Sequence, residues 1–261
     1  MIQRLITTRL RDLDWAAIAV ELLIVVVGVF IGIEVSNWNQ ARVTDQQAAV
    51  FAERLRADLR EEYWGYQLLI AYNQEVLKNA EQAVNALAGR TTASDEALLI
   101  SAYRATQYKQ RLRRRSTYDE LISTGAIGLI RDQRLRDTAM RLYNVATIEN
   151  LAREGMQSRY REAFRMALPN DVQRTLGKNC GDRYIETGDF TAIHGVLDYP
   201  CRTGLSTQAV GDAANVLRAN ADLVPLLQLR IADIETRLGD LTGNNRSILE
   251  SLSAIAADPG R

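Results

Sequence analysis

The sequence has only one histidine, His194, and lacks the short motifs that identify common enzyme classes. No Ser-His-Asp arrangement can be proposed around His194, because it lies in a stretch expected to be a loop. There is no glycine-rich phosphate loop followed by lysine, and no His-Glu-x-x-His helix for zinc. Glu61 and Glu62 would point in different directions on a helix, so they are expected to be solvated rather than catalytic. We expect a protein that is not an enzyme and has no catalytic residue or cofactor.

Cysteine is almost as scarce, because Cys180 and Cys201 are the only two in the chain. Two thiols and one imidazole lack the paired spacing of a zinc site, so no metal site is expected. The two cysteines bracket a glycine-rich stretch, and a disulfide closing this loop would stabilise the fold by about 3 kcal/mol. The alternative is a pair of unrelated buried thiols, which a cytoplasmic location would favour.

Neither sign of charge is in excess, since 32 lysines and arginines balance 32 aspartates and glutamates. This balance gives no indication of a nucleic-acid partner or of an acidic substrate. Proline is also rare, with four in the chain, and only 7% of the residues are aromatic. Such a composition, rich in alanine, leucine, arginine and glutamate, predicts long helices rather than a sheet. We expect an all-α fold: an N-terminal transmembrane helix, then a long-helix bundle with one disulfide-stapled irregular loop.

One long apolar stretch is present, and it runs from Trp15 to Trp38. In a helix these two tryptophans would stand about 34 Å apart, close to the hydrocarbon thickness of a bilayer. Indole rings prefer the headgroup level, so the pair would anchor both ends of a transmembrane helix. The sequence therefore predicts a protein that is held in a membrane.

This stretch has two alternative interpretations besides a transmembrane anchor. The first alternative is a buried helix of a soluble protein, because the uncharged core, Leu22–Ile33, is short for a membrane span. Adding residues 16–20 brings the apolar length into the range of a span, but it also includes Glu21. A cleaved signal peptide is the other alternative. The exit, Glu34–Trp38, has no small-x-small cleavage pattern, so a retained signal anchor is favoured.

Basic residues are distributed unequally around the span. Three arginines, Arg4, Arg9 and Arg11, precede it, whereas Arg42 is the first basic residue to follow it. This asymmetry favours a cytoplasmic N-terminus and, in a Gram-negative bacterium, an inner-membrane protein with a periplasmic main domain. The expected segments are a cytoplasmic tail over 1–14, a transmembrane helix over 15–38 and an extracytoplasmic helical domain over 39–261.

Hydrophobic spacing and capping residues predict the order of elements in the main domain. The expected elements are helices over 41–88, 94–110, 116–125 and 132–168, an irregular loop over 177–205 and a last helical block over 226–257. The first helix is expected to continue from the membrane helix, either unbroken or as two helices with a kink near Gly65. Ser94 or Asp95 would cap the second helix, Gly125 would end the third, and Pro169 would stop the fourth.

The last helical block carries the clearest repeat in the chain. Its seam positions alternate at spacings of four and three residues: Leu227, Ile231, Ile234, Leu238, Leu241, Asn245, Ile248, Leu252 and Ile255. This is a heptad seam with Asn245 at an a-type position, where a polar residue can fix register. We interpret the seam as a core face that packs within one chain. The alternative is a self-dimerising coiled coil, which Gly239 and Gly243 weaken.

Two groups of residues are candidate binding surfaces. Glu21, Val25, Gly28 and Gly32 share one stripe of the membrane helix. The glycines permit close helix approach and a carboxyl in hydrocarbon needs a partner, so the stripe is a candidate docking face for another transmembrane helix. Glycines are also common in spans without a specific role, which is the alternative.

The densest basic run is the second candidate. It consists of Lys109, Arg111, Arg113, Arg114 and Arg115. Acidic lipid headgroups, a phosphorylated glycan or an acidic protein would suit such a run. The alternative is a solvated helix end, where arginines also favour the C-terminal dipole.

Two segments have a familiar pattern. In Glu21–Asn39 an acidic residue, a Leu/Ile/Val run and a glycine precede Asn37-Trp38-Asn39, and Ser116–Ile130 is followed by Leu135-Arg136 and Leu142-Tyr143. These segments resemble an uncharacterised bacterial family of single-span membrane proteins, a domain of unknown function. The resemblance implies membrane anchoring and helical content, and it implies no activity.

Together these observations favour a non-enzymatic accessory or scaffold subunit. Its expected partners are the lipid bilayer and another integral membrane protein or complex, or a second copy of itself; no nucleic-acid partner is expected. A periplasmic ligand-binding sensor domain that signals through a partner is the alternative, and an unrecognised hydrolase comes third.

Overall fold

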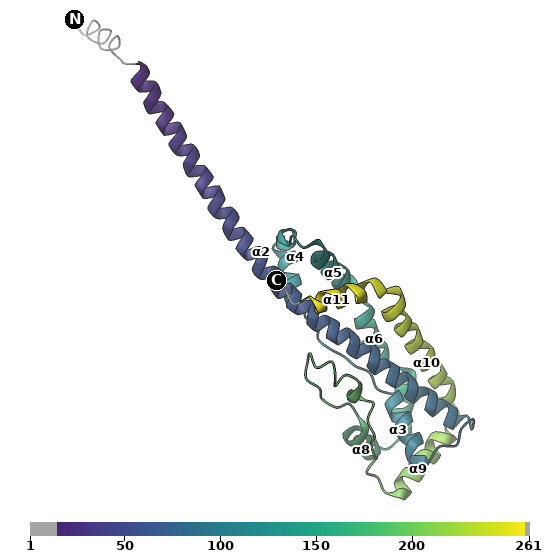
Figure 1. Ribbon diagram of the computed structural model, residues 1–261. Helices are drawn as coiled ribbons and strands as arrows, with labels where there is room; N and C mark the ends of the chain where they lie inside the picture. The colour runs from purple at the N-terminus through teal and green to yellow at the C-terminus, as the bar shows by residue number, and fades with distance from the viewer. Residues whose placement is uncertain (1–14, 259–261) are drawn as a thin grey trace, which may run out of the picture. The chain divides into compact units, whose positions relative to one another are not determined.

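The computed structural model describes residues 15–258, and the predicted tail over 1–14, with its three arginines, lies outside this range. The described part is all-helical and contains no strand, as the composition predicts. Its α-helices are α2 (Trp15–Leu87), α3 (Asp95–Ala105), α4 (Ser116–Ser123), α5 (Gln133–Asn144), α6 (Thr147–Met156), α7 (Arg159–Ala167), α8 (Asn170–Cys180), α9 (Thr207–Ala219), α10 (Leu223–Gly239) and α11 (Arg246–Ala257) (Figure 1). Shorter turns are η1 (Ala126–Leu129), η2 (His194–Val196) and the π-helical η3 (Asp240–Asn244).

Contacts divide the chain into two units, the first ending at Phe51 and the second beginning at Ala52. The boundary therefore falls inside α2, whereas the sequence suggested a boundary after Trp38. In the first unit the described residues form helix only, and the large apolar side chains from Trp15 to Trp38 are exposed. An 18-residue window of this helix is apolar enough to cross a membrane, and none of it is buried. A candidate membrane-spanning helix is thus present where the sequence predicts it.

α2 is a continuous helix from Trp15 to Leu87, so the predicted continuation is confirmed and the alternative of two helices divided near Gly65 is wrong. The start of α3 is also as predicted, because the Ser94 side chain accepts a hydrogen bond from the Ala97 N–H at 3.1 Å. The predicted end of this helix is wrong, because α3 stops at Ala105 rather than near Gln110.

Residues 106–115 leave helical geometry because other elements bind their backbone groups. The carbonyl of Thr106 accepts a hydrogen bond from Arg161 at 3.0 Å, and the carbonyl of Gln107 accepts one from Arg230 at 3.0 Å. The backbone N–H of Arg114 donates to Glu62 on α2 at 2.7 Å. These partners come from distant parts of the chain, so the local pattern could not indicate them.

The single long helix predicted over 132–168 is wrong, since this range contains three helices, α5, α6 and α7. Asp132 caps α5 as predicted, accepting from the Leu135 N–H at 3.0 Å. Extended backbone at Val145 and at Ser158 separates the three helices. The apolar positions of the pattern, apart from Ala146, are nevertheless buried: Leu135, Ala139, Leu142, Leu151, Tyr160 and Phe164. Short helices in sequence bury the faces that one long helix was expected to bury.

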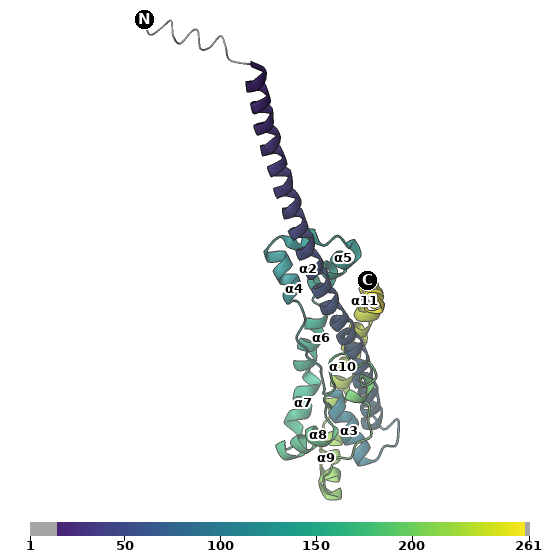
Figure 2. The same ribbon diagram turned by 60° about the vertical axis from the view of Figure 1, so that its left-hand side comes forward.

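The core of the second unit forms where the C-terminal half of α2 packs against α10 (Figures 1 and 2). Leu227, near the start of α10, shares an apolar cluster with Val84 of α2. Ile234, farther along α10, shares a cluster with Val76 of α2. The two helices therefore run antiparallel. α3, α7, α8 and α9 contribute further side chains to the first of these clusters.

The heptad seam is buried or half-buried within the chain, which agrees with its interpretation as a core face. It is not a continuous helix, because the π-helical turn η3 separates α10 from α11. Asn245 ends this turn, and its side-chain amide donates to the carbonyl of Asp240 at 2.9 Å. Asn245 therefore holds the turn before α11 rather than fixing the register of a coiled coil.

The irregular loop predicted over 177–205 begins only after Cys180, because α8 extends to that residue. Apart from η2, the loop has no regular element among the described residues. Val196 and Leu197 join the apolar cluster of Trp64 on α2. The loop thus packs on the core through its middle.

Candidate functional site

The predicted docking face lies in the first unit. Glu21, Val25, Gly28 and Gly32 are all exposed on one helix, as the sequence predicts. A methyl group added at Gly28 or at Gly32 would meet no atom within 4 Å. The face is therefore open for a second helix, and docking itself stays a prediction.

Cys180 and Cys201 form a disulfide, with their Cα atoms 5.5 Å apart and their positions separated by 21 in the sequence. The bond joins the C-terminal end of α8 to the segment that leads into α9. The alternative of two unrelated thiols is therefore wrong for this structure. The disulfide therefore links the two ends of the loop covalently.

A buried cation, Arg104 of α3, reinforces the same closure. Its guanidinium donates to the carbonyl of Cys180 at 3.2 Å and to the carbonyl of Tyr199 at 2.9 Å. The group also lies over the Tyr199 ring, 4.7 Å from its centroid. Arg104 thus holds both sides of the loop, a role that its sequence position in an amphipathic helix does not indicate.

The basic run lies in the irregular segment after α3, so the alternative of a helix end is wrong. Each of its five cations contacts a carboxylate of the same chain. The pairs are Lys109–Asp182 at 2.9 Å, Arg111–Glu62 at 3.0 Å, Arg113–Glu62 at 3.3 Å, Arg114–Glu61 at 2.8 Å and Arg115–Asp119 at 3.0 Å. These cations already have internal counter-charges, and their binding to an anionic partner stays a prediction.

Glu62 is the centre of this arrangement, and the expectation that it is solvated is wrong. Its side chain is fully buried, and the side chains of Arg111 and Arg113 are only 9% and 5% exposed. The carboxylate accepts hydrogen bonds from both guanidinium groups and from the Arg114 N–H. A buried carboxylate needs such partners to offset its desolvation. Glu62 therefore fastens the segment over 106–115 to α2.

Gly65 has a packing role in the same cluster. A Cβ atom placed on Gly65 would lie 2.1 Å from Cζ of Arg111. Arg111 therefore reaches Glu62 by passing over the α2 backbone at the one position there without a side chain. This explains a glycine inside a long helix, where it costs about 1 kcal/mol relative to alanine.

Replacing Gly65 with alanine is expected to lower the free energy of unfolding by about 1–3 kcal/mol, although alanine is the better helix former. The new methyl group would push the Arg111 guanidinium away from buried Glu62. Urea denaturation of the two proteins measures the change. In an Arg111→Ala background the same substitution is expected to be neutral or stabilising. A loss of equal size in both backgrounds would contradict this explanation.

A groove of about 630 Å³ lies beside the basic run and Trp64. The buried indole Nε1 of Trp64 has no hydrogen-bond partner among the described residues. Leu112 and Tyr184 also line the groove, and they are 92% and 91% exposed. The groove is therefore amphipathic, with apolar and aromatic surface beside the paired cations of the basic run.

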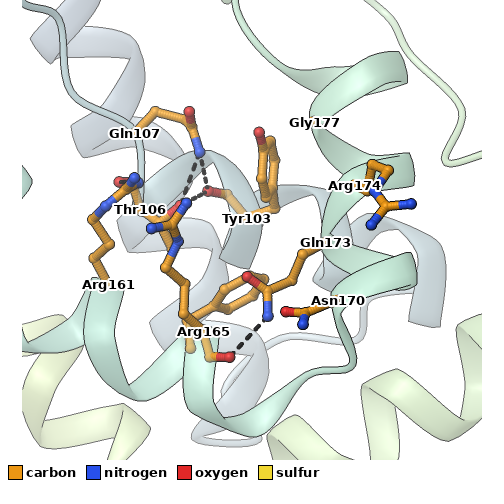
Figure 3. A pocket seen from close by; sticks show the side chains of 10 residues that line it. Tyr103, Thr106, Gln107, Arg161, Arg165, Asn170, Gln173, Arg174 and Gly177 are labelled. Atoms are coloured by element: carbon orange, nitrogen blue, oxygen red, sulfur yellow. Dashed lines mark hydrogen bonds between the residues drawn. The ribbon is translucent and has the colours of Figure 1, made fainter.

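A second cavity, of about 390 Å³, lies between α3, α7 and α8 (Figure 3). The sequence predicted no site here. Three arginines line it: Arg161 and Arg165 extend from α7 toward the end of α3, and Arg174 lies across the cavity on α8. The polar side chains of Tyr103 and Asn170 also line the cavity. No aspartate or glutamate is among the residues that line it.

The three arginines of this cavity form no salt bridge with a carboxylate of the described residues, in contrast to the basic run. Arg161 donates to the Thr106 carbonyl and lies over the Tyr108 ring, 4.9 Å from its centroid. Arg165 and Arg174 are exposed, and their guanidinium groups have no hydrogen-bond partner in the part of the chain that the structure describes. The cavity therefore has a positive lining that the protein itself does not neutralise.

Comparison with known proteins places the N-terminal half of the chain in a family. A model described as a Family of unknown function (DUF6090) matches residues 21–154. The chain belongs to this family. No curated protein and no solved structure matches it significantly.

The DUF6090 match includes the apolar stretch from Glu21 onward, Glu62 and the basic run, and it ends before α7. Arg161, Arg165 and Arg174 therefore lie outside the matched region, as does the disulfide. Sequence reasoning missed Glu62, Arg104 and the arginine-lined cavity. One signal was available for Glu62: a run of closely spaced arginines with balanced overall charge requires carboxylates elsewhere in the chain.

Proposed function

We propose that this protein is a bacterial inner-membrane protein with one span, a cytoplasmic N-terminus and a periplasmic helical domain. It acts as a non-enzymatic accessory or scaffold subunit that binds another integral membrane protein or complex, or a second copy of itself. The observation that carries the proposal is the face of Glu21, Gly28 and Gly32 on an exposed apolar helix, where added methyl groups at both glycines would meet no atom.

Physical chemistry supports this use of the face. Lipid tails are as apolar as leucine, so helices associate in a membrane through close packing and polar contacts rather than through hydrophobic burial. Glycines spaced four apart allow two backbones to approach closely, and Glu21 supplies a polar group that favours a partner. The disulfide supports the periplasmic assignment, because such bonds persist in oxidising compartments.

Replacing Gly28 with isoleucine is expected to weaken association with the membrane partner by about tenfold, which corresponds to the 1–2 kcal/mol typical of such contacts. Affinity purification of the full-length protein from native membranes in mild detergent, with quantitative mass spectrometry, measures the partner that is retained. Glu21→Ala is expected to act in the same direction.

Val26 provides the matched control, because it lies on the opposite side of the helix from Gly28. Val26→Phe also adds volume within the apolar stretch and is expected to leave the partner bound. Unchanged assembly of both the Gly28→Ile and Glu21→Ala proteins, or equal loss in the Val26→Phe protein, would refute docking through this face.

A periplasmic ligand-binding sensor that signals through a partner is the second candidate function. The arginine-lined cavity favours it, because this cavity is concave, carries several polar donors and has a volume within the range of small-molecule sites. In this case the membrane face would transmit the signal to the partner. A measurement of ligand binding to the cavity would separate this function from a purely structural role.

A further inference from the structure

The cavity between α3, α7 and α8 has the features of a preformed anion-binding site. Its charged lining residues are all arginines: Arg161, Arg165 and Arg174. They come from two helices that are joined only by residues 168 and 169, so local chain geometry holds them near each other. Guanidinium groups are suited to oxyanions, because their planar forks bind carboxylate or phosphate through two parallel hydrogen bonds.

The surroundings of Arg161 in this cavity disfavour its positive charge. Burial lowers the pKa of Arg161, and the positive charge of Arg165 lowers it further. Arg230 donates to the carbonyl of the lining residue Gln107; it is 4% exposed, and its Nε has no hydrogen-bond partner among the described residues. Burial lowers the pKa of Arg230 to about 10, and Arg161 contributes to the shift, while Asp233 and Glu154 oppose it. A bound anion would offset the repulsion that Arg161 receives from Arg165.

Neutral groups in the cavity can complete the coordination of an anion. The side chains of Tyr103 and Asn170 have no hydrogen-bond partner among the described residues, so both have donors to offer. The amide nitrogen of Gln173 already donates to the carbonyl of Arg165 at 2.8 Å (Figure 3). It also donates to the carbonyl of Leu168 at 2.7 Å. These two bonds fix the start of α8 against the end of α7, and with it the distance across the cavity.

We propose that this cavity is a binding site for a small oxyanion with at least two negative charges, held by Arg161, Arg165 and Arg174. The volume of about 390 Å³ is at the low end for ligand sites and suits a molecule of the size of a tricarboxylate or a phosphorylated sugar. Three guanidinium groups exclude cations and favour dianions over monoanions. The proposal goes beyond docking through the membrane helix and does not depend on it.

Isothermal titration of the full-length protein in an uncharged detergent tests the site with three probes: inorganic phosphate, pyrophosphate and citrate. Saturable binding of at least one probe at low ionic strength is expected. The ranking of the three probes distinguishes a phosphate ligand from a carboxylate ligand. No saturable binding of any of them would overturn the proposal.

Arg165→Gln and Arg174→Gln are the informative variants, because both side chains are exposed and their replacement leaves the core intact. Each is expected to weaken binding by at least tenfold. Arg159→Gln is the matched control: Arg159 is exposed on the same helix, α7, and does not line the cavity. Equal weakening in all three variants would show a diffuse charge effect and overturn the proposal. The Gly28→Ile protein is expected to bind the anion normally, so loss of docking and loss of the anion site are distinguishable.

Discussion

Replacing Glu62 with glutamine is expected to lower the free energy of unfolding of the helical domain by about 3–5 kcal/mol, the usual cost of removing one partner from a buried ion pair. The carboxylate is fully buried, and its removal leaves the Arg111 and Arg113 guanidinium groups without their shared counter-charge. Arg113 would retain Glu149, which is 49% exposed, whereas Arg111 would have no other salt bridge among the described residues. For a domain of this size the melting temperature would fall by roughly 10 °C. Near-ultraviolet circular dichroism during heating measures it.

Glu61 provides a control next to Glu62. It pairs with Arg114, but the two side chains are 27% and 61% exposed, so solvent screens the interaction. Glu61→Gln is expected to change the melting temperature little. A large effect at Glu61, or a small one at Glu62, would contradict the assignment of Glu62 as the group that fastens residues 106–115 to α2.

Reduction of the Cys180–Cys201 bond is expected to lower the free energy of unfolding by about 3 kcal/mol, because the unfolded chain regains the freedom of a closed loop. Chemical denaturation of the full-length protein with and without dithiothreitol measures this loss. The Cys180→Ala/Cys201→Ala protein is expected to be equally destabilised and still folded, since Arg104 continues to bind both sides of the loop.

The double variant is also the control for reductant. Dithiothreitol should leave its stability unchanged, because it has no other cysteine. In the wild-type protein taken directly from membranes, maleimide should label neither cysteine until the protein is denatured and reduced. Labelling of denatured protein without reduction would show free thiols and argue against both the bond and a periplasmic domain.

Local signals predicted the features that depend on a few neighbouring residues. Ser94 and Asp132 accept hydrogen bonds from the first turns of α3 and α5, as N-cap residues do. Gly125 follows α4 with φ of 72°, a conformation that glycine adopts without strain. Apolar periodicity identified the buried faces, and cysteine spacing with the expected compartment predicted the disulfide.

Features that depend on distant residues could not be predicted. The end of α3 depends on bonds from Arg161 and Arg230 to the backbone that follows it. The burial of Glu62 depends on residues 106–115 lying over α2, although a carboxylate at this position of a helix looks solvated from sequence. In both cases tertiary hydrogen bonds override local propensity.

The sequence did not predict the arginine-lined cavity for a related reason. Arg161 and Arg165 are spaced four apart, which in sequence is the polar face of an amphipathic helix. Only the placement of α7 against α8 brings Arg174 across from them and leaves aspartate and glutamate out of the lining. The cluster of like charges therefore depends on tertiary packing and leaves no signal in the local sequence.

The antiparallel pairing of α2 with α10 and η3 also sets the order of events during synthesis. Tyr66 of α2 bonds to the carbonyl of Leu241, 175 residues later in the chain. At ribosomal rates of about 5–20 residues per second, roughly 10–35 seconds pass between the synthesis of these two residues. The apolar side chains of Val76 and Val84 on the same helix likewise precede their α10 partners by well over a hundred residues. This half of α2 therefore gains the cover of α10 and η3 only when the last helices have been made.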